Sequence, residues 1–384
     1  MQFSCWLVVG TLLICLAGAQ AQSADSQAGT SGGTDSSIQS STASFFRAAA
    51  EKGDPRAQTS LGLLYLEGYG VVQDYAQEAI WYRKAAEQGY APAQVALAQL
   101  YDQGQGVPKD YVQAVGWYRK AAIQGEALAQ YSLGNHYEFG RGVEESYVQA
   151  VSWFQKAAVQ GEALAQFSLG YLANMGIGVP QDYSQAALWY EKSAEQGYDM
   201  AQLNLGVLYD LGKGVPLDYS QAALWFRKAA EQGNAMAQGK LASSYYQGQG
   251  LPQDYSQAAL WYRKGAEQNN SLAQYFLGRL YEMGHGVPQD YSQAALWYRK
   301  AAEQNASLAQ FSLGTLYEYG KGVPQNYSQA YFWLDLATAG STDTLAKLAT
   351  EERDKAASSL TPSELTREQE RAQKWFEEHS AQTQ

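Results

Sequence analysis

The chain has few of the side chains on which most catalytic and metal sites depend. Its 384 residues include only two cysteines, Cys5 and Cys15, and three histidines, His136, His285 and His379. Both cysteines lie in the first sixteen residues, and the histidines are far apart in sequence. We therefore expect no disulfide framework, no metal or acid–base cluster and no cofactor. Each histidine is expected to be a packed or surface residue.

Basic runs are also missing. Lys and Arg number 27 against 38 Asp and Glu, which gives a formal net charge of −11. No cluster of Lys or Arg occurs at any point of the chain. Because nucleic acids and anionic membrane surfaces bind basic patches, neither is an expected partner.

The N-terminus carries an apolar run from Cys5 to Ala19. Small residues over 17–21 suit cleavage, and the run is too short for a good transmembrane helix, so residues 1–21 predict a signal peptide. No Lys or Arg precedes the run, and an uncleaved anchor is the alternative. Cleavage would leave an exported protein, periplasmic or secreted, without a stable membrane span. Residues 22–43 are mostly Ser, Thr, Gly, Gln and Ala, and predict a flexible linker.

A tryptophan recurs at every thirty-sixth residue. The series comprises Trp81, Trp117, Trp153, Trp189, Trp225, Trp261, Trp297 and Trp333. A fixed period of this length is typical of stacked supersecondary units. We expect the indoles to pack between adjacent repeats, since a line of exposed aromatic rings would favour aggregation. The alternative is an aromatic binding strip.

Within each period the sequence predicts two helices joined by a seven-residue turn. The first carries one apolar stripe, as at Ala57, Leu61 and Tyr65, and a small residue such as Gly62 that indicates a close helix crossing. The second begins at an N-cap residue such as Asp74, with Gln three residues later, which is a capping-box pattern. Neither helix can bury its apolar face alone, so neighbouring repeats must stack.

These features resemble the Sel1-like repeat, a relative of the tetratricopeptide repeat with a longer turn between its helices. Eight copies over residues 44–341 carry the segments Ala-Gln-x-x-Leu-Gly-x-Leu-Tyr, Gly-x-Gly-Val-Pro-x-Asp-Tyr and Trp-Tyr-x-Lys-Ala-Ala-Glu-Gln-Gly, with local variations. The resemblance implies an all-α fold, an α/α right-handed superhelical solenoid of eight 36-residue repeats, with a concave groove lined by the first helices. Residues 342–384 predict two capping helices, near 344–358 and 363–379.

The resemblance also implies a non-catalytic scaffold or adaptor for protein–protein interactions, and it specifies no ligand. A cysteine-rich secreted subfamily is linked to β-lactam binding, but the repeats of this chain contain no cysteine. An envelope enzyme or antibiotic-binding protein acting on peptidoglycan or β-lactams is the alternative. The sequence shows no convergent Ser/Lys, Ser/His or carboxylate set for such an enzyme.

Positions of the first helices that differ between copies are the candidates for partner contact. Aromatic residues alternate there with acids, which suits a protein or peptide partner with apolar anchors and basic groups. An ordinary solvated helix face is the alternative. The predicted groove residues are Asp102, Tyr131, Asn135, Glu138, Phe167, Tyr171, Asp210, Tyr246, Arg279 and Glu282.

Overall fold

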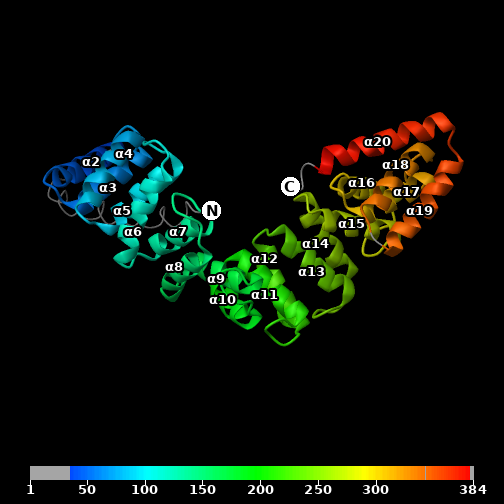
Figure 1. Cartoon of the computed structure of the whole chain (residues 1–384), viewed down its shortest axis with the longest axis horizontal. Coiled ribbons are helices and arrows are strands. Elements are labelled where there is room, and N and C mark those ends of the chain that lie inside the picture. The colour runs from blue at the N-terminus through cyan, green and yellow to red at the C-terminus, as the bar shows by residue number, and fades with distance from the viewer. Residues whose placement is uncertain (1–34, 342, 381–384) are drawn as a thin grey trace. The chain divides into compact units, whose positions relative to one another are not determined.

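The computed structural model describes residues 35–341 and 343–380, and over these ranges the chain is entirely α-helical (Figure 1). The first helices of the eight repeats are α3 (Pro55–Glu67), α5 (Ala91–Gln103), α7 (Ala127–Glu138), α9 (Ala163–Met175), α11 (Asp199–Leu211), α13 (Ala235–Gln247), α15 (Ser271–Met283) and α17 (Ser307–Tyr319). The second helices are α4 (Tyr75–Glu87), α6 (Tyr111–Ile123), α8 (Tyr147–Val159), α10 (Tyr183–Glu195), α12 (Tyr219–Glu231), α14 (Tyr255–Glu267), α16 (Tyr291–Ala302) and α18 (Tyr327–Ala339). The all-α class and the eight repeats of paired helices are therefore confirmed.

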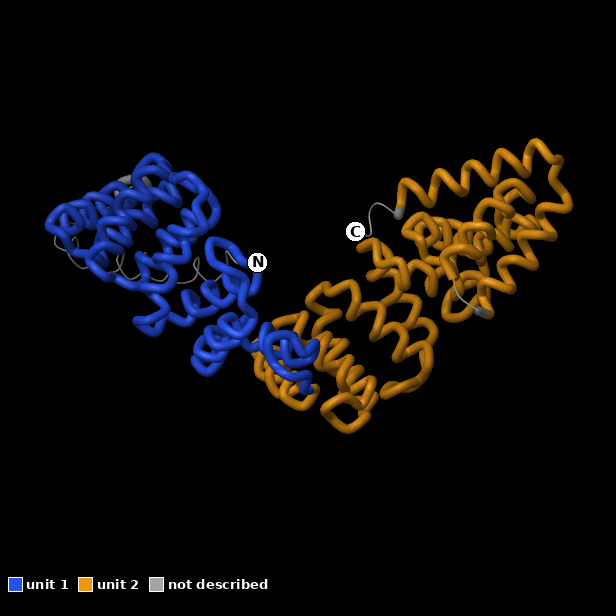
Figure 2. The backbone as a smooth tube through the Cα atoms, in the orientation of Figure 1, with its two compact units in different colours: residues 1–182 blue, residues 183–384 orange. Residues whose placement is uncertain are grey.

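The chain forms two compact units, residues 1–182 and 183–384 (Figure 2). Within each unit the helices pack in chain order, so that a first helix such as α5 lies between α4 of the preceding repeat and its own partner α6. The core is accordingly a series of small apolar clusters, each shared by neighbouring helices.

The prediction of a flexible linker over residues 22–43 is wrong for its last part. Helix α2 (Asp35–Glu51) includes residues 35–43. Two features stabilise this helix despite its polar composition. Ala43 is buried in a cluster with Leu61 and Trp81. The hydroxyls of Thr42 and Ser44 donate hydrogen bonds to the backbone carbonyl oxygens four residues earlier. The expected signal peptide and residues 22–34 lie outside the described ranges.

The small residue of the first helix lies against an aromatic ring of the second helix. A Cβ atom added at Gly62 would be 2.6 Å from the Tyr82 ring, and one at Gly206 would be 2.7 Å from the Phe226 ring. Both distances are shorter than a real contact allows. The close crossing predicted from the sequence is therefore confirmed, and it is set by the residue that follows each tryptophan.

The seven-residue turn after the first helix is confirmed, and its capping differs in one respect from the capping box. Asp74 accepts hydrogen bonds from the backbone N–H groups of Ala76 and Gln77, at 2.9 and 3.0 Å. The N–H of Asp74 itself donates to the carbonyl oxygen of Tyr65 at 3.0 Å, not to the Gln77 side chain. The N-cap residue thus ties the turn back to the first helix.

A buried glutamine joins adjacent repeats, a role that the repeat pattern did not predict. Gln94 is 3% exposed; its Nε2 donates to the carbonyl oxygen of Ala86 in the preceding repeat at 3.1 Å. Its Oε1 accepts from Nε2 of Gln124 at 2.8 Å. The same pair of bonds is made by Gln58, Gln130, Gln202, Gln238 and Gln274. Satisfying both polar atoms lets an amide be buried at each repeat junction.

The end of the array is covered by α19 (Asp343–Ser358) and α20 (Pro362–Ser380), close to the ranges predicted for capping helices. Both pack on α18. Ala356 and Ala372 are buried there beside Phe332, and Trp375 packs at the edge of the same cluster. No helix in the described part of the chain is long and apolar enough to cross a membrane.

Candidate partner-binding surfaces

All ten predicted groove residues lie on first helices, and they are divided between the two units. Six belong to the first unit and form what we call the N-terminal surface: Asp102, Tyr131, Asn135, Glu138, Phe167 and Tyr171. Four belong to the second unit and form the C-terminal surface: Asp210, Tyr246, Arg279 and Glu282.

On the N-terminal surface, Asp102 is engaged by a buried histidine. His136 is 3% exposed and occupies the position at which Leu64 and Leu100 of the preceding repeats are buried. Its Nδ1 lies 2.7 Å from the carbonyl oxygen of Arg141, and its Nε2 lies 3.3 Å from Oδ1 of Asp102. Both ring nitrogens therefore face oxygen atoms of neighbouring residues. His136 is therefore a packed residue, and it orients Asp102 toward the protein.

The two acids of the C-terminal surface, Asp210 and Glu282, also interact with other residues of the chain. Oδ2 of Asp210 lies 3.5 Å from Nζ of Lys240, and the hydroxyl of Tyr298 donates to Oε2 of Glu282 at 2.5 Å. Burial and the nearby Glu282 raise the pKa of Tyr298, which keeps this hydroxyl a donor. Three of the four predicted acids thus have intramolecular partners, and Glu138, whose pKa burial raises, is the fourth.

Tyr246 of the C-terminal surface belongs to a cluster of aromatic rings. Tyr246 on α13 lies 6.1 Å from Phe276 on α15, between ring centroids, and Phe276 is stacked on Tyr262 of α14 at 5.2 Å. Tyr275 adds an edge contact with Phe276, with 5.2 Å between the ring centroids. Phe276 was not among the predicted groove residues, although its departure from the repeat is visible in the sequence, where the corresponding residues of other repeats include Ser60 and Ser132.

The N-terminal surface has a more accessible ring. Tyr171 on α9 is 40% exposed, whereas Tyr131 is half-buried, with its ring centroid 5.7 Å from that of Phe154. Phe167 is half-buried on the same helix as Tyr171. An exposed ring beside half-buried ones is the kind of anchor that polypeptide binding uses.

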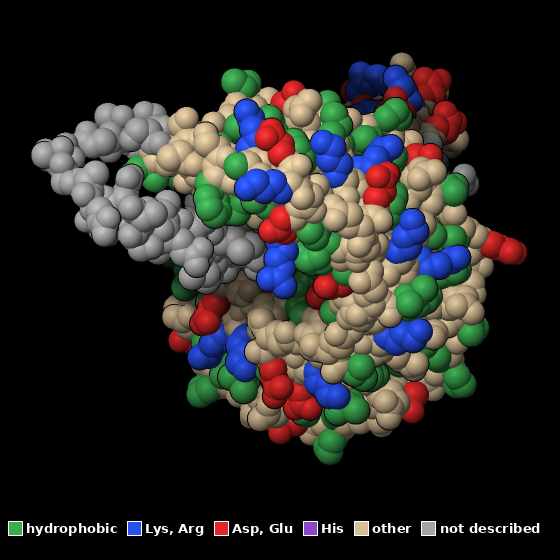
Figure 3. Space-filling view, turned by 90° about the vertical axis from the view of Figure 1, so that its left-hand side faces the viewer, with side chains coloured by type: hydrophobic (Ala, Val, Ile, Leu, Met, Phe, Trp, Pro, Cys, Tyr) green, Lys and Arg blue, Asp and Glu red, His purple; other side chains and the backbone are tan. Residues whose placement is uncertain are grey.

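Charged side chains of both signs are mixed on one face of the molecule. On the face in Figure 3, Lys and Arg side chains are interspersed with Asp and Glu side chains, without a broad field of one sign. Across the described ranges no group of three or more His, Cys, Asp and Glu residues could hold a metal ion.

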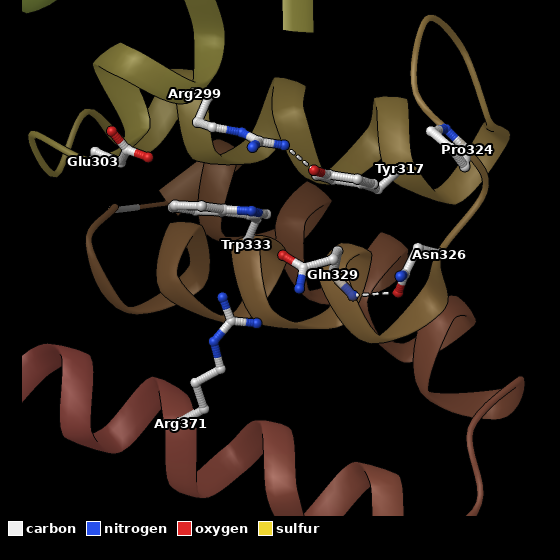
Figure 4. A pocket seen from close by; sticks show the side chains of 8 residues that line it. All are labelled: Arg299, Glu303, Tyr317, Pro324, Asn326, Gln329, Trp333 and Arg371. Atoms are coloured by element: carbon white, nitrogen blue, oxygen red, sulfur yellow. Dashed lines mark hydrogen bonds between the residues drawn. The ribbon is translucent and has the colours of Figure 1, made fainter. Parts of the chain in front are cut away.

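A separate pocket lies beside the last repeat (Figure 4). This Trp333 pocket has a volume of about 380 Å³. Helices α16, α17, α18 and α20 contribute to it. Its lining residues are Arg299, Glu303, Tyr317, Pro324, Asn326, Gln329, Trp333 and Arg371.

Comparison with known families identifies the repeat. The Sel1 repeat model matches residues 55–90, 91–126, 127–162, 163–198, 199–234, 235–270, 271–305 and 307–341. No curated protein is significantly similar to the chain.

Two solved structures are similar over most of the chain. One is a Sel1 repeat protein from Oxalobacter formigenes, with 33% identity over 80% of this chain and 89% of that one, at a TM-score of 0.61. The other is a protective antigen present in uropathogenic Escherichia coli strains, described as having an SLR fold. It shares 32% identity over 88% of this chain and 95% of that one, at a TM-score of 0.58.

Proposed function

Because the chain belongs to the Sel1 repeat family, we propose that it is a non-catalytic scaffold that binds polypeptide partners through its N-terminal and C-terminal surfaces. Sel1 repeat proteins are generally protein-interaction scaffolds. One observation carries the proposal. On the first helices, framework residues are the same from repeat to repeat, whereas the positions beside them change and include aromatic residues. A rigid framework that presents such residues holds a binding surface in place without an ordering cost.

The contacts favour apolar anchoring as the main source of affinity. Tyr171 presents an exposed ring, and Tyr246 belongs to a set of packed aromatic rings. The acids that suggested a basic partner are mostly engaged, so Glu138 is the residue through which a basic group of the partner would bind. The partner we propose is therefore a segment with aromatic or aliphatic side chains and a smaller number of basic ones.

Export to the periplasm or the medium is part of the proposal. It is supported by the apolar run from Cys5 to Ala19 with small residues behind it. Such a segment directs secretion when it is recognised as a signal peptide.

Binding through the first helices can be tested with two matched substitutions. Tyr171→Ser removes the exposed ring of α9, and Val159→Ser removes an apolar side chain that is 77% exposed on the second helix α8. Affinity capture from extracts of the producing cells, quantified by mass spectrometry, should lose its specific polypeptides with Tyr171→Ser and keep them with Val159→Ser. Equal capture by both variants would contradict binding at the N-terminal surface.

The alternative of an envelope enzyme or antibiotic-binding protein has a direct assay. Purified protein should neither hydrolyse nor retain a chromogenic β-lactam, and it should leave muropeptides unchanged in chromatographic analysis. Turnover of either substrate would replace the scaffold proposal with an enzymatic one.

A further inference from the structure

The last repeat differs from the others at the positions that form the Trp333 pocket. Six repeats have Asp at the N-cap of the second helix and one has Ser146, whereas the last repeat has Asn326. The neutral amide keeps the capping function, because Oδ1 of Asn326 accepts from the N–H of Gln329 at 2.9 Å. The change therefore removes a negative charge and leaves a side-chain N–H₂ donor at the pocket wall.

Trp333 also differs from the other repeat tryptophans, because no lysine of its own helix lies over its indole ring. In the seven preceding repeats a Lys three residues after the Trp places its Nζ over the indole, between 3.7 Å from the ring centroid at Trp117 and 4.5 Å at Trp189. The last repeat has the buried Leu336 at this position. No lysine of α18 therefore covers the ring that lines the pocket.

Two arginines from different helices lie on opposite sides of Trp333 (Figure 4). Arg299 of α16 donates to the hydroxyl of Tyr317, and it forms no ion pair with any residue that the structure describes. Arg371 of α20 lies 3.7 Å from the centroid of the Phe332 ring. Its Nη1 pairs with Oε2 of Glu368 at 3.2 Å.

We propose that the Trp333 pocket binds a carboxylate attached to an apolar or aromatic group. Two guanidinium groups and the amides of Asn326 and Gln329 supply donors, and the indole supplies an apolar wall. Glu303 is the one acid of the lining, and Arg371 already pairs with Glu368, so Arg299 is the guanidinium left without an ion pair, which suits a monoanion better than a phosphate dianion. The pocket volume of about 380 Å³ suits one amino-acid-sized group.

This site is independent of the surfaces on the first helices. It is built from the second helices α16 and α18, the turn before α18 and the cap helix α20, with Tyr317 as its one residue from a first helix. The carboxylate can come from the C-terminal residue of a polypeptide or from a free small acid, and the probes below distinguish these sources.

Isothermal titration of the full chain with N-acetyl-phenylalanine and N-acetyl-phenylalaninamide tests the proposal. The acid should bind, and the amide should bind about ten-fold more weakly or not at all, because it lacks the charge that the arginines neutralise. Asn326→Asp should weaken binding of the acid by a similar factor. This substitution places a carboxylate in the pocket yet restores the cap residue of six other repeats, so folding should be retained and is checked by thermal unfolding.

A matched control uses the preceding repeat. Arg263→Gln removes a hydrogen bond to Tyr281 that is equivalent to the Arg299–Tyr317 bond but lies outside the pocket lining, and binding should not change. Arg299→Gln should weaken binding as Asn326→Asp does. Tighter binding by an acetylated tripeptide that ends in phenylalanine would assign the site to polypeptide C-termini; equal binding would assign it to free acids.

Three results would overturn the proposal. One is equal binding of acid and amide, another is unchanged binding by Asn326→Asp, and the third is no heat of binding with any carboxylate probe at millimolar concentration. Tighter binding of inorganic phosphate than of N-acetyl-phenylalanine would overturn the assignment to carboxylates.

Discussion

Two aromatic columns run next to each other along the second helices, and they are packed differently. The tryptophan column supplies the most regular period in the sequence. The inner column, one residue later in each repeat, consists of Tyr82, Tyr118, Phe154, Tyr190, Phe226, Tyr262 and Tyr298, with Leu334 in the last repeat. Each inner-column residue is 3% exposed or less, whereas Trp117, Trp153, Trp189 and Trp261 are only half-buried.

The difference follows from what each column contacts. Inner-column rings fill the space left by small residues of the first helix, as Phe226 does beside Gly206. A tryptophan bridges to the preceding repeat, as Trp117 does by packing against the cluster of Ala79 and Tyr82, while a lysine covers its other side. The expected packing of the indoles between repeats is thus confirmed, but the inner column is the more deeply buried of the two.

The largest loss of stability should come from removing a ring of the inner column. Phe226→Ala should lower the free energy of unfolding by about 3–5 kcal/mol, because the ring is fully buried and leaves a cavity. Urea denaturation, with hydrogen exchange of α11 and α12, measures the loss. Leu224→Ala, at a side chain that is 45% exposed on the same helix, should cost less than about 1 kcal/mol. Equal losses would contradict the special position of the inner column.

Adding an atom at the contact between Gly206 and Phe226 should lower the free energy of unfolding by less than Phe226→Ala does. Gly206→Ala places a Cβ atom 2.7 Å from the Phe226 ring, so the helices must separate, with an expected loss of about 1–3 kcal/mol. Gly116→Ala is the matched control, because a Cβ atom there has no atom within 4 Å. It should stabilise α6 by up to about 1 kcal/mol through helix propensity. Thermal unfolding of both variants tests the cause of the loss. If the close helix crossing is responsible, Gly206→Ala lowers the stability and Gly116→Ala does not.

Removing a half-buried tryptophan should have a smaller effect than removing an inner-column ring. Trp189→Ala should lower the free energy of unfolding by about 1–2 kcal/mol, since part of the ring is already exposed and Lys192 covers it from the solvent side. The same urea titration compares it with Phe226→Ala. A loss as large as that of Phe226→Ala would make the two columns equivalent.

One departure from the repeat places a carboxyl group beside the inner column. Glu78 is 2% exposed, its Oε2 has no hydrogen-bond partner among the described residues, and every other repeat has a buried alanine at this position. Burial raises its pKa to about 8. Between the ordinary carboxyl pKa and pH 8 the folded chain therefore binds more protons than the unfolded chain, and stability falls as pH rises.

Glu78→Ala should remove that loss. The variant should gain a few kcal/mol at pH 8, because each unit by which the pKa is raised corresponds to about 1.4 kcal/mol, and little at pH 4, where the carboxyl group is mostly protonated in both states. Glu87→Ala, at an exposed position of the same helix, is the control and should show no such pH dependence. An equal gain at both pH values would show that ionisation of Glu78 is not the cause.

The repeat period, the small residue at the crossing and the capping helices could be predicted from the sequence because local chemistry determines them. The contact between Asp102 and His136 could not be predicted from the sequence, because it joins side chains of two different repeats. Helix α2 was missed because its Ser- and Thr-rich start is stabilised by packing on the first repeat. The Trp333 pocket needs Arg371, which is 38 residues from Trp333 in sequence, so only the folded chain brings them together.

Site-specific photo-crosslinking in producing cells tests the scaffold account most directly. A photoreactive amino acid would replace either Tyr171, on the first helix α9, or Val148, which is 66% exposed on the second helix α8 of the same unit. The account predicts that a defined set of polypeptides is crosslinked from position 171 and not from position 148. Crosslinks from position 148 without any from position 171 would contradict it.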